Sequence, residues 1–119
     1  MVNEVIKVKI FKDDKDYINR YTISGHSGYD IKGNDIVCAA VSVLAQTVLF
    51  SLVEVCGVKE EEVYYFVEEE KGILDVCLPK AIDKSIKDRT QIVLKTLELG
   101  IKAIVENYPE YVILEYGEV

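Results

Sequence analysis

The stretch GHSGYDIKGNDIVCAAVSVLAQTVLFSLVEV, from Gly25 to Val55, decides the fold of this chain. From about Ile36 onward it is almost continuously apolar, and this run predicts a long helix that ends near Val55. Asn34 or Asp35 is the expected N-cap, and Gly57 stands just beyond the helix end. Three glycines ahead of the helix predict a bendable loop.

Alternating apolar residues on both sides of this stretch predict a sheet. Two strands, Val5 to Phe11 and Tyr17 to Ser24, flank a tight turn at Asp13–Asp16 and form a hairpin. Two more strands, Val63 to Val67 and Ile73 to Leu78, follow the helix. These segments supply most of the expected sheet.

A second helix and a last strand complete the chain. The helix is expected from near Ser85, where Ser85 and Asp88 resemble a capping box, to Tyr108. Its apolar stripe comprises Ile86, Val93, Leu94, Leu97, Ile101, Ile104, Val105 and Tyr108. The last strand is expected from Tyr111 to Tyr116. The order ββαββαβ predicts an α+β fold, with two helices packed on one mixed sheet, in a single domain over residues 1–119.

Composition limits the classes of function. The 119 residues are half hydrophobic, so the chain can bury a core by itself, and the formal charge of −7 argues against direct nucleic-acid binding. This charge suits a basic partner, although the simpler interpretation of the acidic runs Glu60–Glu62 and Glu68–Glu70 is solvated charge. Three cysteines, an odd number, favour reduced thiols, and the start at Met1 lacks a signal-peptide pattern. We therefore expect a cytoplasmic protein.

The first helix is apolar around its whole circumference. Its length approaches a membrane span, but polar positions such as Gln46 and Glu54 favour a buried helix, so no membrane partner is expected. One stripe comprises Val37, Val41, Leu44, Val48, Leu52 and Val55. Because Val43, Leu49 and Phe50 fall elsewhere, a second protomer is needed to cover them, and we predict a homodimer.

A cysteine and the single histidine flank the glycine loop and suggest nucleophilic catalysis. If Asp35 is the N-cap, Cys38 is the third residue of the helix, near unpaired backbone amides and the positive end of the helix dipole. This placement favours the thiolate, and His26 can take the thiol proton and later protonate a leaving amine.

Further residues can support this pair. Asp35 can orient His26, and Ser42 lies one turn after Cys38 on the same helix face. The amides around Cys38 and the loop glycines Gly25, Gly28 and Gly33 are candidates for an oxyanion hole.

A structural interpretation of the same residues stays open. A cysteine among apolar neighbours is more often a buried small side chain, and a single loop histidine is usually just polar. Core packing also explains Cys56 and Cys77. A metal site is not expected, because one histidine and one nearby cysteine fall short of the ligands that zinc requires, and no cofactor is implied.

The segments GHSGYD and GNDIVCAAVS resemble the signature of the ribosomal-processing cysteine protease family, Prp. The resemblance extends over chain length, element order, the Leu99-Gly100-Ile101 step and the late YPEY sequence at residues 108–111. It places the family's catalytic histidine on His26 and its nucleophile on Cys38. Its helix-start aspartate falls on Asp35, and its loop glycines fall on Gly25 and Gly33.

This resemblance implies a cysteine endopeptidase that removes the N-terminal extension of a large-subunit ribosomal protein in bacteria. It also implies a homodimer of α+β fold, with a mobile loop between histidine and cysteine that orders over the substrate. Ser27 departs from the alanine that many relatives carry, which leaves substrate detail open more than chemistry.

Two other functions are compatible with the sequence. One is a non-catalytic ribosome-associated binding module that retains the fold. The other is a thiol-based redox protein, which is the weaker alternative because the chain has no Cys-x-x-Cys motif. For the protease, the loop from Ser27 to Asn34 is expected to be mobile and to close over a bound peptide.

Overall fold

Alternating burial forms the first hairpin of the sheet. In the computed structural model, which describes residues 5–26 and 36–119, strand β1 spans Ile6–Lys12 and strand β2 spans Ile18–Ser24. They pair antiparallel, with Val8 opposite Ile23. The Asp13 carboxylate accepts hydrogen bonds from two backbone amides of the connecting turn, which closes the hairpin where the sequence predicts a turn.

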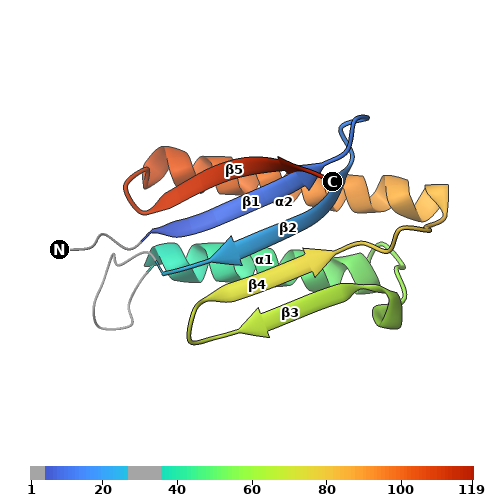
Figure 1. Cartoon of the computed structure of the whole chain (residues 1–119), viewed down its shortest axis with the longest axis horizontal. Coiled ribbons are helices and arrows are strands. Elements are labelled where there is room, and N and C mark those ends of the chain that lie inside the picture. The colour runs from blue at the N-terminus through green and yellow to red at the C-terminus, as the bar shows by residue number, and fades with distance from the viewer. Residues whose placement is uncertain (1–4, 27–35) are drawn as a thin grey trace.

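The other strands extend this hairpin on both sides. Strands β3 (Tyr64–Glu68) and β4 (Ile73–Cys77) form a second hairpin, and β4 pairs antiparallel with β2. The last strand, β5 (Val112–Glu118), lies parallel to β1, so the sheet is mixed and has the order β3-β4-β2-β1-β5. Figure 1 shows both helices on one face of this sheet. The predicted α+β architecture is confirmed.

Helix α1, Ile36–Glu54, packs one stripe of small and branched side chains onto the sheet. Its fully buried residues are Val37, Val41, Ala45, Val48 and Leu52. The hydroxyl of buried Tyr21, on β2, donates to the Ala45 carbonyl at 2.8 Å. The expectation that Val55 shares this stripe is wrong, because Val55 lies beyond the helix end and is 68% exposed.

The opposite face of α1 is apolar and exposed. Val43 is 65% exposed and Phe50 is 63% exposed. The expectation of a buried helix therefore holds for one face of α1 and fails for the other. By length and composition α1 is sufficient to cross a membrane, which is also true of many helices in folded domains.

Helix α2, Lys84–Asn107, begins one residue earlier than expected, with Asp83 as its N-cap. The predicted capping box is wrong: the Ser85 hydroxyl donates to the Asp83 carboxylate, and Asp88 pairs with Lys84 at 3.0 Å. Leu94, Leu97 and Ile101 from the expected stripe are buried. The stripe as predicted contained apolar residues alone, but Thr90, Gln91 and Glu98 are buried on the same helix.

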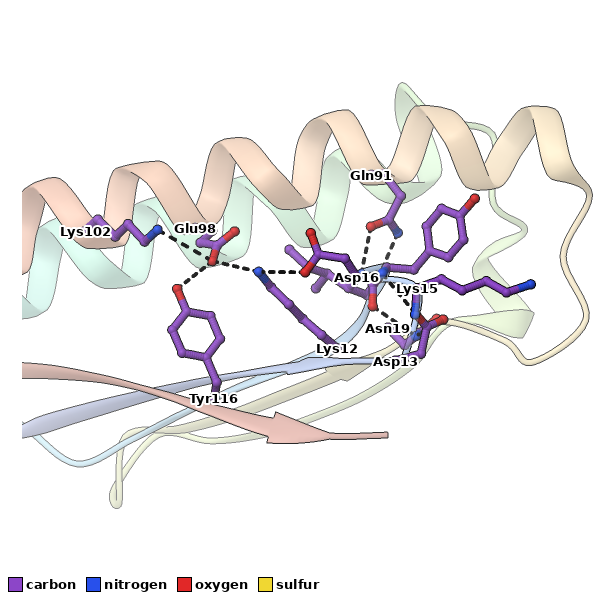
Figure 2. Close-up of polar contacts among 11 residues, drawn as sticks. Lys12, Asp13, Lys15, Asp16, Asn19, Gln91, Glu98, Lys102 and Tyr116 are labelled. Carbon is purple, nitrogen blue, oxygen red and sulfur yellow. Dashed lines mark hydrogen bonds and ion pairs between the residues drawn. The ribbon is translucent and has the colours of Figure 1, made fainter.

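Two of these polar residues connect α2 to the strands of the sheet (Figure 2). The Gln91 side chain bonds both backbone groups of Ile18, accepting from its N–H at 2.7 Å and donating to its carbonyl at 2.9 Å. Glu98 accepts a hydrogen bond of 2.5 Å from the Tyr116 hydroxyl and pairs with Lys12 at 3.2 Å. Both buried side chains therefore have hydrogen-bond or ion-pair partners, which lie on β1, β2 and β5.

Candidate active site

A cavity of about 440 Å³ opens between the start of α1, the end of β2 and the β3–β4 turn. His26 enters it from the end of β2, and Cys38 enters it from the first turn of α1. Gly25 and Ser42 also line the cavity. The fold thus brings four of the residues singled out from the sequence to one place.

Cys38 is the third residue of α1, as the sequence predicts. It is half-buried and packs partly against the core while also lining the cavity. This position is compatible with both the structural and the catalytic interpretation of Cys38. Its position in the first helical turn places it among backbone amides that lack intrahelical partners.

Ser42 follows one turn later and is exposed. Its hydroxyl accepts a hydrogen bond of 3.0 Å from the side-chain amide of Gln46, which also lines the cavity. The two residues form a polar strip along the cavity side of α1.

His26 is exposed, and its Nε2 lies 2.9 Å from the Glu70 carbonyl oxygen in the β3–β4 turn. The preceding residue, Gly25, donates its backbone N–H to the Lys71 carbonyl of the same turn at 3.2 Å. Because the Gly25 N–H already donates this hydrogen bond, the backbone amides at the start of α1 are better candidates than Gly25 for an oxyanion hole.

The β3–β4 turn contributes cavity residues that sequence reasoning missed. Glu68, Glu69 and Gly72 line the cavity beside His26. The sequence signal was the run of glutamates before a glycine, but the position of this turn depends on β4 pairing with β2. Without the strand order, the turn could not be assigned to the site.

Asp35, Gly28 and Gly33, the remaining candidates, lie outside the described residues, as does the loop expected to close over a substrate. Within residues 5–26 and 36–119, the structure has no group of three or more histidine, cysteine or carboxylate side chains placed to hold a metal ion.

The other two cysteines lie away from this cavity. Cys56 is fully buried just after α1, and burial raises the pKa of its thiol. Cys77 lies half-buried at the end of β4, where its thiol donates to the Leu78 carbonyl at 3.5 Å. Core packing is confirmed for Cys56, and none of the three cysteines, all of which the structure describes, forms a disulfide.

An α+β domain with a cysteine and a histidine at one cavity is compatible with the class of cysteine proteases. The chain belongs to this class, and specifically to the Prp family, because the family model described as cysteine protease Prp matches residues 5–113. The family assignment makes the chain a hydrolase of peptide bonds.

Relatives of known sequence or structure agree with this assignment. A Staphylococcus aureus protein named ribosomal processing cysteine protease Prp is 27% identical over 113 residues, which cover 94% of this chain and 99% of that protein. A crystal structure of Prp from S. aureus with a covalently linked product peptide superposes with a TM-score of 0.80 at 23% identity, over 94% of this chain and 99% of that one.

A second similar structure comes from another bacterium. SMU.848 from Streptococcus mutans is 25% identical and superposes with a TM-score of 0.75, over 97% of this chain and 96% of that chain. The chain therefore shares its fold with both structures over nearly its whole length.

Proposed function

We propose that this chain removes the N-terminal extension of a large-subunit ribosomal protein during ribosome assembly, using Cys38 as nucleophile and His26 as its base. The observation that carries the proposal is that the single histidine and the helix-start cysteine line the same cavity. The name of the S. aureus relatives, ribosomal processing cysteine protease, supports the choice of substrate.

The chemistry follows from these two side chains. His26 takes the Cys38 thiol proton, and the thiolate attacks the carbonyl carbon of the scissile peptide bond. The tetrahedral intermediate places negative charge on the carbonyl oxygen, which amides of the first helical turn can stabilise. His26 then returns the proton to the leaving amine, and water hydrolyses the thioester that remains on Cys38.

Other residues have supporting roles in this proposal. Ser42 and Gln46 supply hydrogen-bonding groups along the cavity side of α1. Asp35 is proposed as the N-cap of α1, the helix that carries Cys38. Glu68 and Glu69 place carboxylates at the cavity, which favours a substrate segment with basic residues.

A cleavage assay tests the proposal. The substrate is a peptide that spans the junction between the extension and the mature ribosomal protein of the host. Cys38→Ala should abolish cleavage, whereas the matched control Cys77→Ala, which removes a thiol on β4, should leave it within about twofold of the unmodified protein. Labelling of Cys38 by an irreversible thiol reagent should abolish cleavage in the same way.

Full activity of Cys38→Ala would contradict the mechanism. Binding of the peptide without cleavage by the unmodified protein would favour the alternative, a non-catalytic module associated with the ribosome. The cytoplasm, where ribosomes assemble, is the compartment that the proposal requires.

We also propose that the protein is a homodimer that covers the exposed face of α1. This face continues into a groove of about 260 Å³ that is lined by Leu49, Phe50 and Val53 of α1 and by Tyr65 of β3. Burial of these side chains in a protomer interface would remove apolar surface from water.

Sedimentation equilibrium tests the dimer. Phe50→Asp should shift the protein toward the monomer mass, whereas Ile92→Asp, at an equally exposed position on α2, should leave the mass unchanged. A monomer near 13.5 kDa for the unmodified protein at micromolar concentration would contradict the proposal.

A further inference from the structure

A backbone carbonyl holds the one histidine of the chain. His26 Nε2 lies 2.9 Å from the carbonyl oxygen of Glu70 in the β3–β4 turn. A carbonyl oxygen can accept a hydrogen bond but cannot donate one, so Nε2 carries the proton of this bond. When the imidazole is neutral, Nδ1 is therefore the nitrogen with the available lone pair, which is what a general base requires.

We infer that the β3–β4 turn sets the tautomer and orientation of His26, so that Nδ1 is the atom that takes the thiol proton and Gly72 is a positioning residue. The inference rests on the proposed function, in which His26 is the base for Cys38. It adds the reacting atom and the structural element that orients it. The Glu70 carbonyl takes the place of the third side chain that orients the base in a catalytic triad.

One backbone hydrogen bond closes the β3–β4 turn, and a second joins the turn to the end of β2. The Gly72 N–H donates to the Glu69 carbonyl at 3.1 Å, which closes the turn. The Gly25 N–H donates to the Lys71 carbonyl at 3.2 Å, which joins the turn to the residue immediately before His26. The pairing of Ile23 with Leu74 continues this connection into the sheet. The Glu70 carbonyl therefore has a fixed position relative to the imidazole.

Gly72 allows this close approach of the turn to the histidine. Its φ of +62° lies in the left-handed region, and a Cβ there would be 2.5 Å from the Gly25 carbonyl oxygen and 3.1 Å from His26 Cε1. The first contact is with the Gly25 backbone, so a side chain at Gly72 must push the turn away from the end of β2, while the second contact crowds the ring. Both effects disturb the bond between Nε2 and Glu70.

The chain offers a matched control for this glycine. Gly57, after α1, has a φ of +88°, and a Cβ there would meet the Arg89 guanidinium at an ordinary 3.4 Å. Alanine is strained at both positions by the left-handed backbone, but Gly57 does not line the cavity. A difference between the two variants therefore reports the contact with His26 and Gly25.

Nuclear magnetic resonance can read the tautomer directly, because the chain has a single histidine. Long-range ¹H–¹⁵N correlation of the neutral imidazole should show the proton on Nε2 in the unmodified protein and a mixture of tautomers in Gly72→Ala. With the junction peptide, Gly72→Ala should lower kcat by about 10- to 100-fold and change KM by less than about threefold. Gly57→Ala should keep the unmodified spectrum and kcat.

Each outcome separates the inference from the proposed function. A proton on Nδ1 in the unmodified protein would overturn the inference, and so would a folded Gly72→Ala that matches Gly57→Ala in spectrum and kcat. If Gly72→Ala does not fold, the unmodified protein is compared with the same chain unfolded in urea, and an equal share of the Nε2–H tautomer in both would overturn the inference. Full activity of His26→Ala would instead overturn the proposed function.

Discussion

The two ends of the sheet are held by different groups. At the end with the Asp13–Asp16 turn, the Glu98 carboxylate pairs with Lys12 and accepts a hydrogen bond from Tyr116 (Figure 2). At the cavity end, the backbone of the β3–β4 turn bonds to Gly25 and His26. The first arrangement uses its polar side chains to satisfy each other, whereas the second leaves carboxylates and an imidazole nitrogen at the cavity. The buried polar network and the candidate active site thus lie at opposite ends of one sheet.

The largest expected effect is on activity, and it is tested by replacing His26 at the cavity end of the sheet. His26→Ala should lower the cleavage rate by at least about a thousandfold, because Cys38 loses its base. Since His26 is exposed, the free energy of unfolding should change by less than about 1 kcal/mol. Kinetics with the junction peptide and unfolding in urea measure the two quantities. A large loss of stability would show that the cavity end also supports the fold.

Replacement of Gln91 should have the largest effect on stability. Gln91→Ala leaves the N–H and carbonyl of buried Ile18 without partners, so we expect a loss of about 3 kcal/mol with activity per folded molecule unchanged. Urea unfolding measures the loss. Ile92→Ala, at the 70% exposed neighbouring position, is the control and should change the free energy of unfolding by less than about 0.5 kcal/mol.

Glu98 should make the free energy of unfolding depend on pH. Burial tends to raise its pKa, but the hydrogen bond from Tyr116 and the bond and charge of Lys12 outweigh burial and hold the pKa below the ordinary 4.5. Stabilisation by the carboxylate is therefore present above pH 4.5, the unfolded value, and is lost as the pH falls through the lower folded-state pKa.

Glu98→Gln tests this dependence. At neutral pH the variant should be less stable by about 1–2 kcal/mol, and the difference should shrink as the pH falls below 4.5. Thermal unfolding across pH 3 to 7 measures it. Exposed Glu106→Gln, on the same helix, should show no such convergence. A constant difference at all pH values would mean that the Glu98 charge contributes nothing.

The smallest effect is expected at Tyr116. Tyr116→Phe removes one hydrogen bond to Glu98 and should lower the free energy of unfolding by about 1 kcal/mol. Burial and the neighbouring Glu98 carboxylate raise the pKa of Tyr116 to about 12. When tyrosine ionisation is followed by absorbance at alkaline pH, the variant should therefore lack an ionisation near pH 12 that the unmodified protein shows. Loss of an ionisation near pH 10 instead would contradict the contact between Tyr116 and Glu98.

The strands and helices could be predicted because each is encoded locally. Alternation placed the first strand at Val5 to Phe11, within one residue of β1 at either end, and the apolar run placed α1 correctly at Ile36. The strand order could not be predicted in this way, because the parallel pairing of β1 with β5 depends on contacts between the two ends of the sequence. Buried Gln91 was missed for the same reason, since its partner Ile18 lies far away in sequence.

In the candidate site, too, some residues could be predicted from the sequence and others depend on long-range contacts. His26 and Cys38 could be selected because their residue types are rare and their motif is specific. The Glu70 contact could not, because every residue carries a carbonyl and the contact depends on how the second hairpin folds back. Side-chain chemistry is visible in sequence, whereas a backbone group acquires its role through topology.

The parallel pairing of the first strand with the last has a consequence for synthesis. Ile6 pairs beside Val112, so β1 lacks its outer neighbour until residues 112–118 have left the ribosome. A nascent chain can form both antiparallel hairpins early, because their contacts are local, but must wait for the long-range closure by β5. The sheet is therefore completed only after both helices and both hairpins have been synthesised, so the protease domain closes as its last strand joins its first.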